Sequence, residues 1–284
     1  MPACWIATCS AVTPAFQACS RHRRNNPRLA EVESLVKPAP AAYSLDGGKL
    51  LLLVGFLVLG VVGWDWPVLW PFKLLAVMGH ETGHAVASLL AGGSVSRVSI
   101  AGNESGECLS AIPTSFFART IVYSAGYVGS AIISVVLLLL TFRFDLRRFM
   151  LGAACVWLSV MGLLYARDAF TLAFCFGMAI AFGLGARFLP AQVVGIVNLF
   201  IASFTALYAA MDLKDDLWNG AVRVHSDAQL LADITPIPAV VWALLWTALA
   251  MTLLGVGVFV AMRRRATPLE MTNRLPNQLL GRSR

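Results

Sequence analysis

His80 and His84 have the spacing of a two-histidine metal site, and Glu81 directly follows the first histidine. In a helix, residues four positions apart project from one face about one turn apart, so both imidazoles can reach a single Zn²⁺ ion. A carboxylate beside that ion can accept the proton of a water bound there, as in metalloproteases with an H-E-x-x-H motif. Residues 80–84 therefore predict a zinc site with Glu81 as the general base.

The motif lies inside an apolar segment that extends from residue 66 to residue 91. A short H-E-x-x-H string that arises by chance usually falls on a solvated helix, which this segment does not resemble. Ionisable side chains inside a membrane are costly and usually functional. The setting of the motif therefore favours a metal site over a coincidence.

The composition is that of a multi-pass membrane protein, because 58% of the 284 residues are hydrophobic and only 13% are charged. The net charge of +7 is spread over the loops between apolar runs, which indicates membrane orientation and argues against nucleic-acid binding. The six cysteines contain no Cys-x-x-Cys pair, so they indicate neither a zinc knuckle nor a disulfide framework.

Apolar runs predict an all-α polytopic integral membrane protein with about seven transmembrane helices. The runs cover residues 49–64, 66–91, 118–142, 149–166, 169–186, 189–211 and 237–262, and the first and fourth are short for a span. Gly92 and Gly93 end the metal-binding helix, and the β-prone residues that follow, up to about Ile112, suggest a small β-hairpin or an ordinary loop.

Three segments are expected along the chain. Residues 1–47 read as a disordered tail or a targeting segment, residues 48–262 as the transmembrane domain, and residues 263–284 as a basic C-terminal tail. Arginines follow the third, fifth and seventh runs, so with seven spans they share the cytoplasmic or equivalent side. The basic tail before residue 49 would then lie on the opposite side. The sequence leaves open whether the membrane belongs to an organelle or is the plasma membrane.

A catalytic zinc usually takes three protein ligands, so an acid must join the histidines. Asp212 follows the run 189–211, and counting chain reversals makes that helix parallel to the metal-binding helix. Asp212 is therefore the expected third ligand, with Asp216 one turn later as the substitute or as a partner that orients a histidine. Asp227 lies in a capping-box pattern from Ser226 to Gln229, which favours a structural role, with metal binding as the alternative.

Residues 66–262 resemble the site-2 protease-like intramembrane zinc metallopeptidases. The resemblance rests on the motif at 80–84, the Gly92-Gly93 pair, the β-prone segment, the helix around 125–130 and a distant aspartate at the membrane boundary. It implies that His80, His84 and an aspartate bind zinc while Glu81 acts as general base. The chain lacks the Asn-x-x-Pro and Asp-Gly motifs of better-known members, since Asn198 has no such proline and Leu213 follows Asp212. It therefore looks like a divergent branch, without a recognisable PDZ-like insertion.

The expected function is zinc-dependent hydrolysis of peptide bonds in membrane-embedded substrates, with the lipid bilayer as the surroundings. The alternative is a non-proteolytic membrane scaffold or regulator that keeps the site only to bind zinc. Glu81 argues against that alternative, because metal binding alone does not need it. A transporter with a midplane metal site is disfavoured by the lack of an evident inverted repeat.

Overall fold

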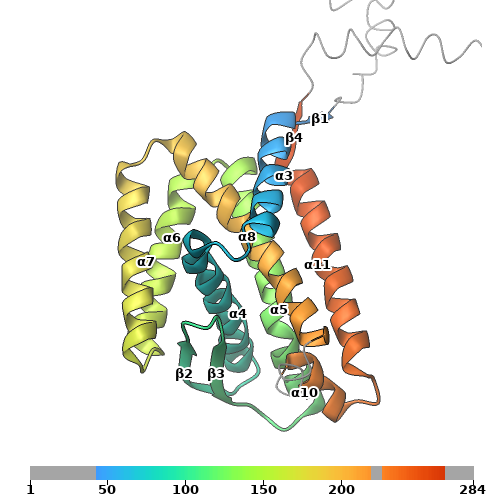
Figure 1. Cartoon of the computed structure of the whole chain (residues 1–284). Coiled ribbons are helices and arrows are strands. Elements are labelled where there is room, and N and C mark those ends of the chain that lie inside the picture. Colours follow the sequence, from blue (N-terminus) through green and yellow to red (C-terminus); the bar gives the residue numbers. More distant parts are fainter. Residues whose placement is uncertain (1–42, 219–225, 266–284) are drawn as a thin grey trace, which may run out of the picture. The chain divides into compact units, whose positions relative to one another are not determined.

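A computed structural model describes the backbone of residues 43–218 and 226–265, and the side chains of residues 44–211 and 226–263. Most of the predicted N-terminal tail and most of the basic C-terminal tail lie outside these residues. Leu45–Arg263 forms one compact unit, which holds the helices and the hairpin shown in Figure 1.

All seven apolar runs form helices, joined by short helices and strands. The long helices are α3 (Gly47–Val62), α4 (Trp70–Leu90), α5 (Phe116–Leu138), α6 (Arg147–Leu164), α7 (Ala169–Phe188), α8 (Ala191–Trp218) and α11 (Ala239–Met262). The shorter elements are η1 (Pro67–Leu69), η2 (Leu139–Arg143), α10 (Asp227–Ile234), β1 (Tyr43–Leu45), β2 (Ser94–Ile100), β3 (Gly106–Ala111) and β4 (Arg263–Arg265). The predicted class, an all-α polytopic membrane protein with a small β-hairpin after the metal-binding helix, is confirmed.

The number of membrane spans comes close to the predicted seven. Within the described residues, five helices are long and apolar enough to cross a membrane: α5 continued by η2, α6, α7, α8 and α11. The helices α3 and α4 form a pair bent by 120°, which raises the number to six if the pair counts as one span. The bend falls in the break between Val62 and Pro67, where Gly63 caps the end of α3 and Trp66, the residue before the proline, is extended (φ −76°, ψ 130°).

The start of α3 lies at the arginine-bearing end of the unit, where Arg148 lies at the start of α6, Arg187 lies in the last turn of α7 and Arg263 follows α11. The backbone N–H of Asp46 donates to the carbonyl of Met262, 2.9 Å away, at the end of α11. Arg148 at the start of α6 donates to the carbonyl of Leu189, just beyond α7, at 2.7 Å. Figure 1 shows these helix ends together at the top. The chain thus enters α3 on the same side as these arginines. Seven upright spans would have placed the basic tail before residue 49 on the opposite side, and the bent pair of helices removes this conflict.

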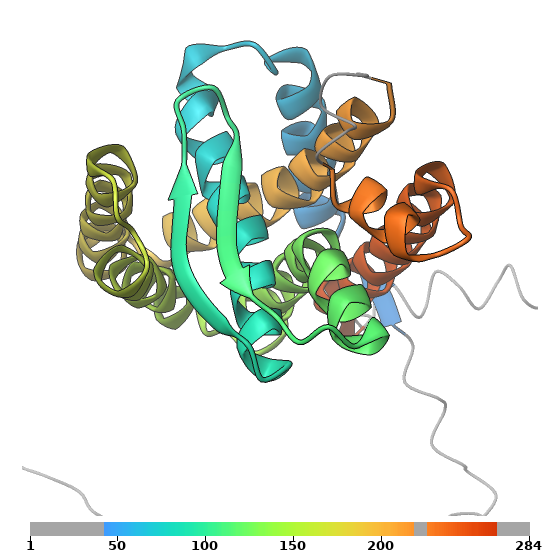
Figure 2. The same cartoon turned by 90° about the horizontal axis from the view of Figure 1, so that it is seen from below.

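The hairpin β2–β3 is antiparallel and lies against α4. Its register extends from Ser94 opposite Ala111 to Ile100 opposite Gly106. The outer strand β2 is fixed to the α6–α7 side, where the N–H of Val98 donates to the carbonyl of Tyr165 at 3.1 Å. Figure 2, the view from below, shows β3 between β2 and the helices α5 and α10, and both strands running alongside α4.

The helix α4 is held on two sides by helices that approach it closely. Gly83 packs against the backbone of Ala125 in α5, where a side chain on Gly83 would overlap the Ala125 carbonyl. On another side, the indole N–H of Trp157 in α6 donates to Thr82 Oγ1 at 3.1 Å. Small residues allow such close approach between membrane helices. The position of the predicted metal-binding helix is therefore fixed by its neighbours.

Candidate metal centre

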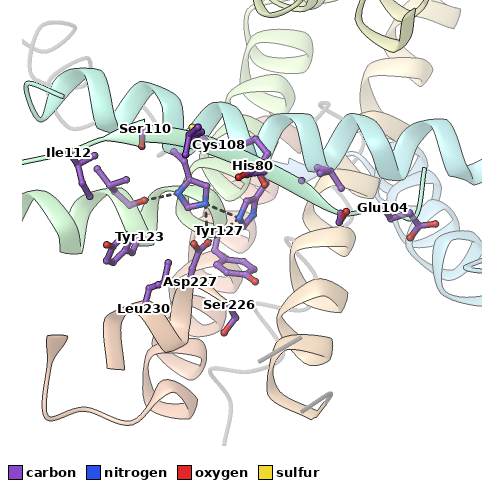
Figure 3. A pocket seen from close by; sticks show the side chains of 18 of the residues that line it. His80, Glu104, Cys108, Ser110, Ile112, Tyr123, Tyr127, Ser226, Asp227 and Leu230 are labelled. Carbon is purple, nitrogen blue, oxygen red and sulfur yellow. Dashed lines mark hydrogen bonds and ion pairs between the residues drawn. The ribbon is translucent and has the colours of Figure 1, made fainter. Parts of the chain in front are cut away.

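Three side chains from two distant segments converge on one point. His80 Nε2 lies 3.0 Å from His84 Nε2, as the four-residue spacing in α4 predicts. Asp227 Oδ2 lies 3.1 Å from His80 Nε2 and 3.0 Å from His84 Nε2. Figure 3 shows the Asp227 side chain pointing from α10 toward the histidines. Within the described residues, His80, His84 and Asp227 form the group that could hold a metal ion.

The proton on His84 can be assigned from its second contact. His84 Nδ1 lies 2.8 Å from the carbonyl oxygen of Val122 in α5. A carbonyl oxygen only accepts hydrogen bonds, so Nδ1 must carry the proton. In the neutral ring the lone pair is then on Nε2, which faces Asp227 and His80, and this is the tautomer that a metal-binding histidine needs.

Asp227 is the first residue of α10, and the start of this helix is capped as the sequence predicts. Ser226 Oγ accepts a hydrogen bond from the N–H of Gln229 at 3.3 Å. The cap accounts for Ser226 but not for the Asp227 carboxylate, which contacts the histidines. Burial alone would raise the pKa of this carboxyl group, yet when the imidazoles are protonated, the charge of His84 and the hydrogen bonds that both histidines donate hold the pKa well below its usual range. The carboxylate therefore stays ionised.

Glu81 lies beside these residues in the wall of a cavity of about 550 Å³. The cavity is also lined by the length of β3, from Gly106 to Ser110, and by Tyr123 and Leu230. Gly106 leaves room for the Glu81 carboxylate, because a Cβ at position 106 would lie 2.5 Å from Glu81 Oε1. The Glu81 side chain is thus placed between the helix that carries the histidines and the strand that borders the cavity.

Two residues of α5 support the histidines, and the sequence analysis assigned neither to the site. Gly126 faces His80 and His84, where a side chain would overlap their ring nitrogens. Tyr127 packs edge-on against His80 with ring centroids 4.7 Å apart, and stacks on Trp246 of α11 at 5.1 Å. The family resemblance includes the helix around 125–130 but gives none of its residues a role at the metal site. Gly126 followed directly by the aromatic Tyr127 in that helix was the available signal.

A partly buried thiol, that of Cys108, lies on the cavity wall. Burial and the negative charge of Glu81 raise the pKa of this thiol to about 12. Cys108 therefore stays protonated, and a neutral thiol is a poor metal ligand.

The other predicted site residues are placed differently. Asp212 and Asp216 belong to the last turns of α8, and their side chains lie outside the described residues, so their role as ligands stays a prediction. Four residues before Asp212, the Tyr208 hydroxyl donates to the carbonyl of Glu104 at 3.3 Å, in the turn of the hairpin. Asn198 is remote from the metal centre, because its side-chain amide donates to the Arg147 carbonyl at 3.0 Å.

Comparison with known proteins gives one positive result. The model of the family described as Peptidase M50B-like matches residues 52–257, which is more than half of the chain and includes His80, Glu81, His84 and Asp227. No curated protein and no solved structure matches the chain. The matched region holds most of the seven long helices, the hairpin and the three converging side chains. The chain therefore belongs to the Peptidase M50B-like family, in the site-2 protease group, and is a multi-pass integral membrane protein with a membrane metallopeptidase fold.

Proposed function

We propose that the protein is an intramembrane zinc metalloprotease that hydrolyses peptide bonds of membrane-embedded substrates. The observation that carries this proposal is the placement of a two-histidine, one-carboxylate cluster and a further carboxylate, Glu81, in the wall of one cavity. A scaffold that only binds zinc needs the cluster but not Glu81 or the cavity.

The donor set fits zinc. Its three facing atoms form a triangle with edges of 3.0, 3.0 and 3.1 Å. A tetrahedral zinc with bonds of about 2.0–2.1 Å spaces its ligand atoms roughly 3.3 Å apart, so the side chains would move by only a few tenths of an ångström. We therefore propose His80, His84 and Asp227 as the zinc ligands, with Asp227 in the place that the sequence analysis gave to Asp212. When bound, zinc would act as a Lewis acid and lower the pKa of water at the site.

Glu81 is proposed as the general base that accepts a proton from the attacking water and returns it to the leaving amine. Its side chain is buried, and it lies between α4 and Gly106 of β3. This packing restricts the carboxylate to the cavity side of α4. The tautomer of His84, fixed by the Val122 carbonyl, keeps the Nε2 lone pair available in the same cavity.

The substrate would bind as an extended peptide along β3. Within the described residues β3 pairs with β2 alone, and its other edge lines the cavity. Such an edge presents unpaired N–H and C=O groups that can pair with an added strand. A transmembrane substrate helix must unwind before its carbonyls become accessible, so helix-breaking residues near the cleavage site should favour hydrolysis.

The test uses the full chain purified in detergent, with fluorescently labelled casein as an unstructured substrate and a single-span membrane protein as a second substrate. The wild-type protein should cleave both, and a chelator should stop cleavage until zinc is restored. Glu81→Gln should keep its zinc and lose activity by about 10²–10⁴-fold, since only the general base is removed. A wild-type protein that binds zinc without cleaving either substrate would instead support the scaffold alternative.

A further inference from the structure

Lys73 is a buried cation in the apolar N-terminal half of α4. Its side chain is 7% exposed, and Nζ lies 3.1 Å from Glu104 Oε1 in the turn of the hairpin. Nζ also lies 4.4 Å from the centroid of the Trp64 ring. A buried ammonium group is unfavourable unless it is paired, so Lys73 and Glu104 depend on each other.

Two further contacts hold the same turn against the helices. The indole N–H of Trp70 in α4 donates to the Gly102 carbonyl at 2.9 Å, and the Tyr208 hydroxyl in α8 donates to the Glu104 carbonyl at 3.3 Å. Glu104 has a φ of 68°, which is rarely adopted by a residue other than glycine. Such a conformation persists when its surroundings determine it. The turn is therefore held in one specific place on α4 and α8.

The opposite end of β3 is fixed to the same helix. Ser88 Oγ in α4 donates to Ser110 Oγ at 3.0 Å. Between the two ends, Gly106 packs against Val77 and Glu81, which follow Lys73 at four-residue intervals on one face of α4. Figure 2 shows β3 alongside α4, and Figure 3 shows Glu104 and Ser110 on opposite sides of His80. The strand thus runs along α4 and is attached to it on both sides of His80, Glu81 and His84.

We propose that the Lys73–Glu104 ion pair holds β3 in a fixed position on α4. The pair thereby sets the register between the cavity-facing edge of β3, where the substrate peptide would bind, and the catalytic cluster of His80, Glu81, His84 and Asp227. Neither Lys73 nor Glu104 acts on the reacting atoms. This proposal rests on the proposed function, because the register matters for catalysis only if β3 binds substrate. Lys73 lies about two helical turns before Glu81 in α4, and a lysine is unusual in such an apolar segment.

Single substitutions in this ion pair should disturb the position of β3 on α4, and a double substitution should restore it. Glu104→Gln leaves the Lys73 charge buried without a counter-ion, and Lys73→Met leaves a carboxylate that would turn toward water. Replacing both partners removes both charges, and neutral replacement of a buried pair is often well tolerated. Each single variant should raise KM for labelled casein about tenfold with kcat within about twofold, and Lys73→Met/Glu104→Gln should recover most of the loss.

Arg97→Gln is the matched control, because it breaks another ion pair of the same hairpin. Arg97 and Glu107 lie 2.8 Å apart with side chains 47% and 53% exposed. Exposed pairs contribute little, so KM should stay within about twofold. Amide hydrogen exchange of residues 102–106 gives a readout that needs no catalysis: both single variants should exchange faster than the wild type, the double variant and Arg97→Gln.

Zinc content measured on every variant separates the two proposals. Wild-type KM and wild-type exchange in both single variants would overturn the positioning role, as would a defect of equal size in Arg97→Gln. If the zinc-loaded wild-type protein cleaves neither casein nor the membrane substrate, the proposed protease function fails. Hydrogen exchange of residues 102–106 then still decides whether the ion pair holds β3 in place on α4.

Discussion

Gly126 in α5 faces His80 in α4 with no side chain between them, and a methyl group at position 126 would overlap Nε2 of His80 and of His84. The histidine nitrogens therefore lie between the backbone of α5 on one side and the Asp227 carboxylate on the other. Only glycine allows this approach. The geometry of the candidate metal centre therefore depends on the crossing of α4 and α5 as much as on the three side chains proposed as ligands.

Gly126→Ala should therefore impair metal binding although no ligand is changed. The added methyl group displaces the imidazoles from Asp227, and we expect zinc affinity to fall by tenfold to hundredfold, about the range for residues that support metal ligands. Metal analysis of the purified protein after dialysis against defined free zinc measures this. Gly79→Ala is the control, since a Cβ there meets nothing within 4 Å. Equal zinc affinity in both variants would show that the histidines adapt to the methyl group.

The choice between Asp227 and Asp212 as third ligand can be decided by substitution. Asp227→Ala removes the oxygen that lies 3.0–3.1 Å from both histidine nitrogens, so this variant should lose most of its zinc. Asp212→Ala should retain its zinc, and Asp216→Ala should do the same. Metal analysis of the three purified proteins is the measurement. The reverse pattern, zinc retained without Asp227 and lost without Asp212, would restore the sequence-based prediction.

The N-terminal cap of α10 gives a graded test of the same ligand. Ser226→Ala removes the hydroxyl that accepts from Gln229 N–H, and loss of such a cap destabilises a helix start by about 1 kcal/mol. Because the Asp227 carboxylate itself remains, zinc affinity should fall by no more than about tenfold. Ser226→Asp also supplies a capping oxygen and should restore it. A loss as complete as that of Asp227→Ala would mean that Ser226 does more than cap the helix.

The sequence could predict the parts of the site that depend on local spacing. His80, Glu81 and His84 share one helix, so the periodicity of α4 is enough to place them in one region. Asp227 lies 147 residues from His80, and its approach depends on how α10 packs after the end of α8. The predicted side of the N-terminal tail assumed seven upright spans, but the break between Val62 and Pro67 bends α4 by 120° relative to α3. Sequence patterns predicted every long helix, whereas the direction of α4 depends on packing against α5, α6 and the hairpin.

The bent α3–α4 pair makes a prediction about topology that differs from that of seven upright spans. Leu45 precedes α3 and Phe144 follows η2, and both are exposed near the arginine-bearing end, whereas Ser96 lies in β2 at the opposite end. In a variant without native cysteines, Leu45→Cys and Phe144→Cys should react with a membrane-impermeant thiol reagent from one side, and Ser96→Cys from the other. Ser96→Cys and Phe144→Cys serve as the reference pair, because α5 with η2 spans the bilayer between them. Labelling of Leu45→Cys together with Ser96→Cys would mean that α3 and α4 cross the membrane separately, and would rule out the bent pair as a single span.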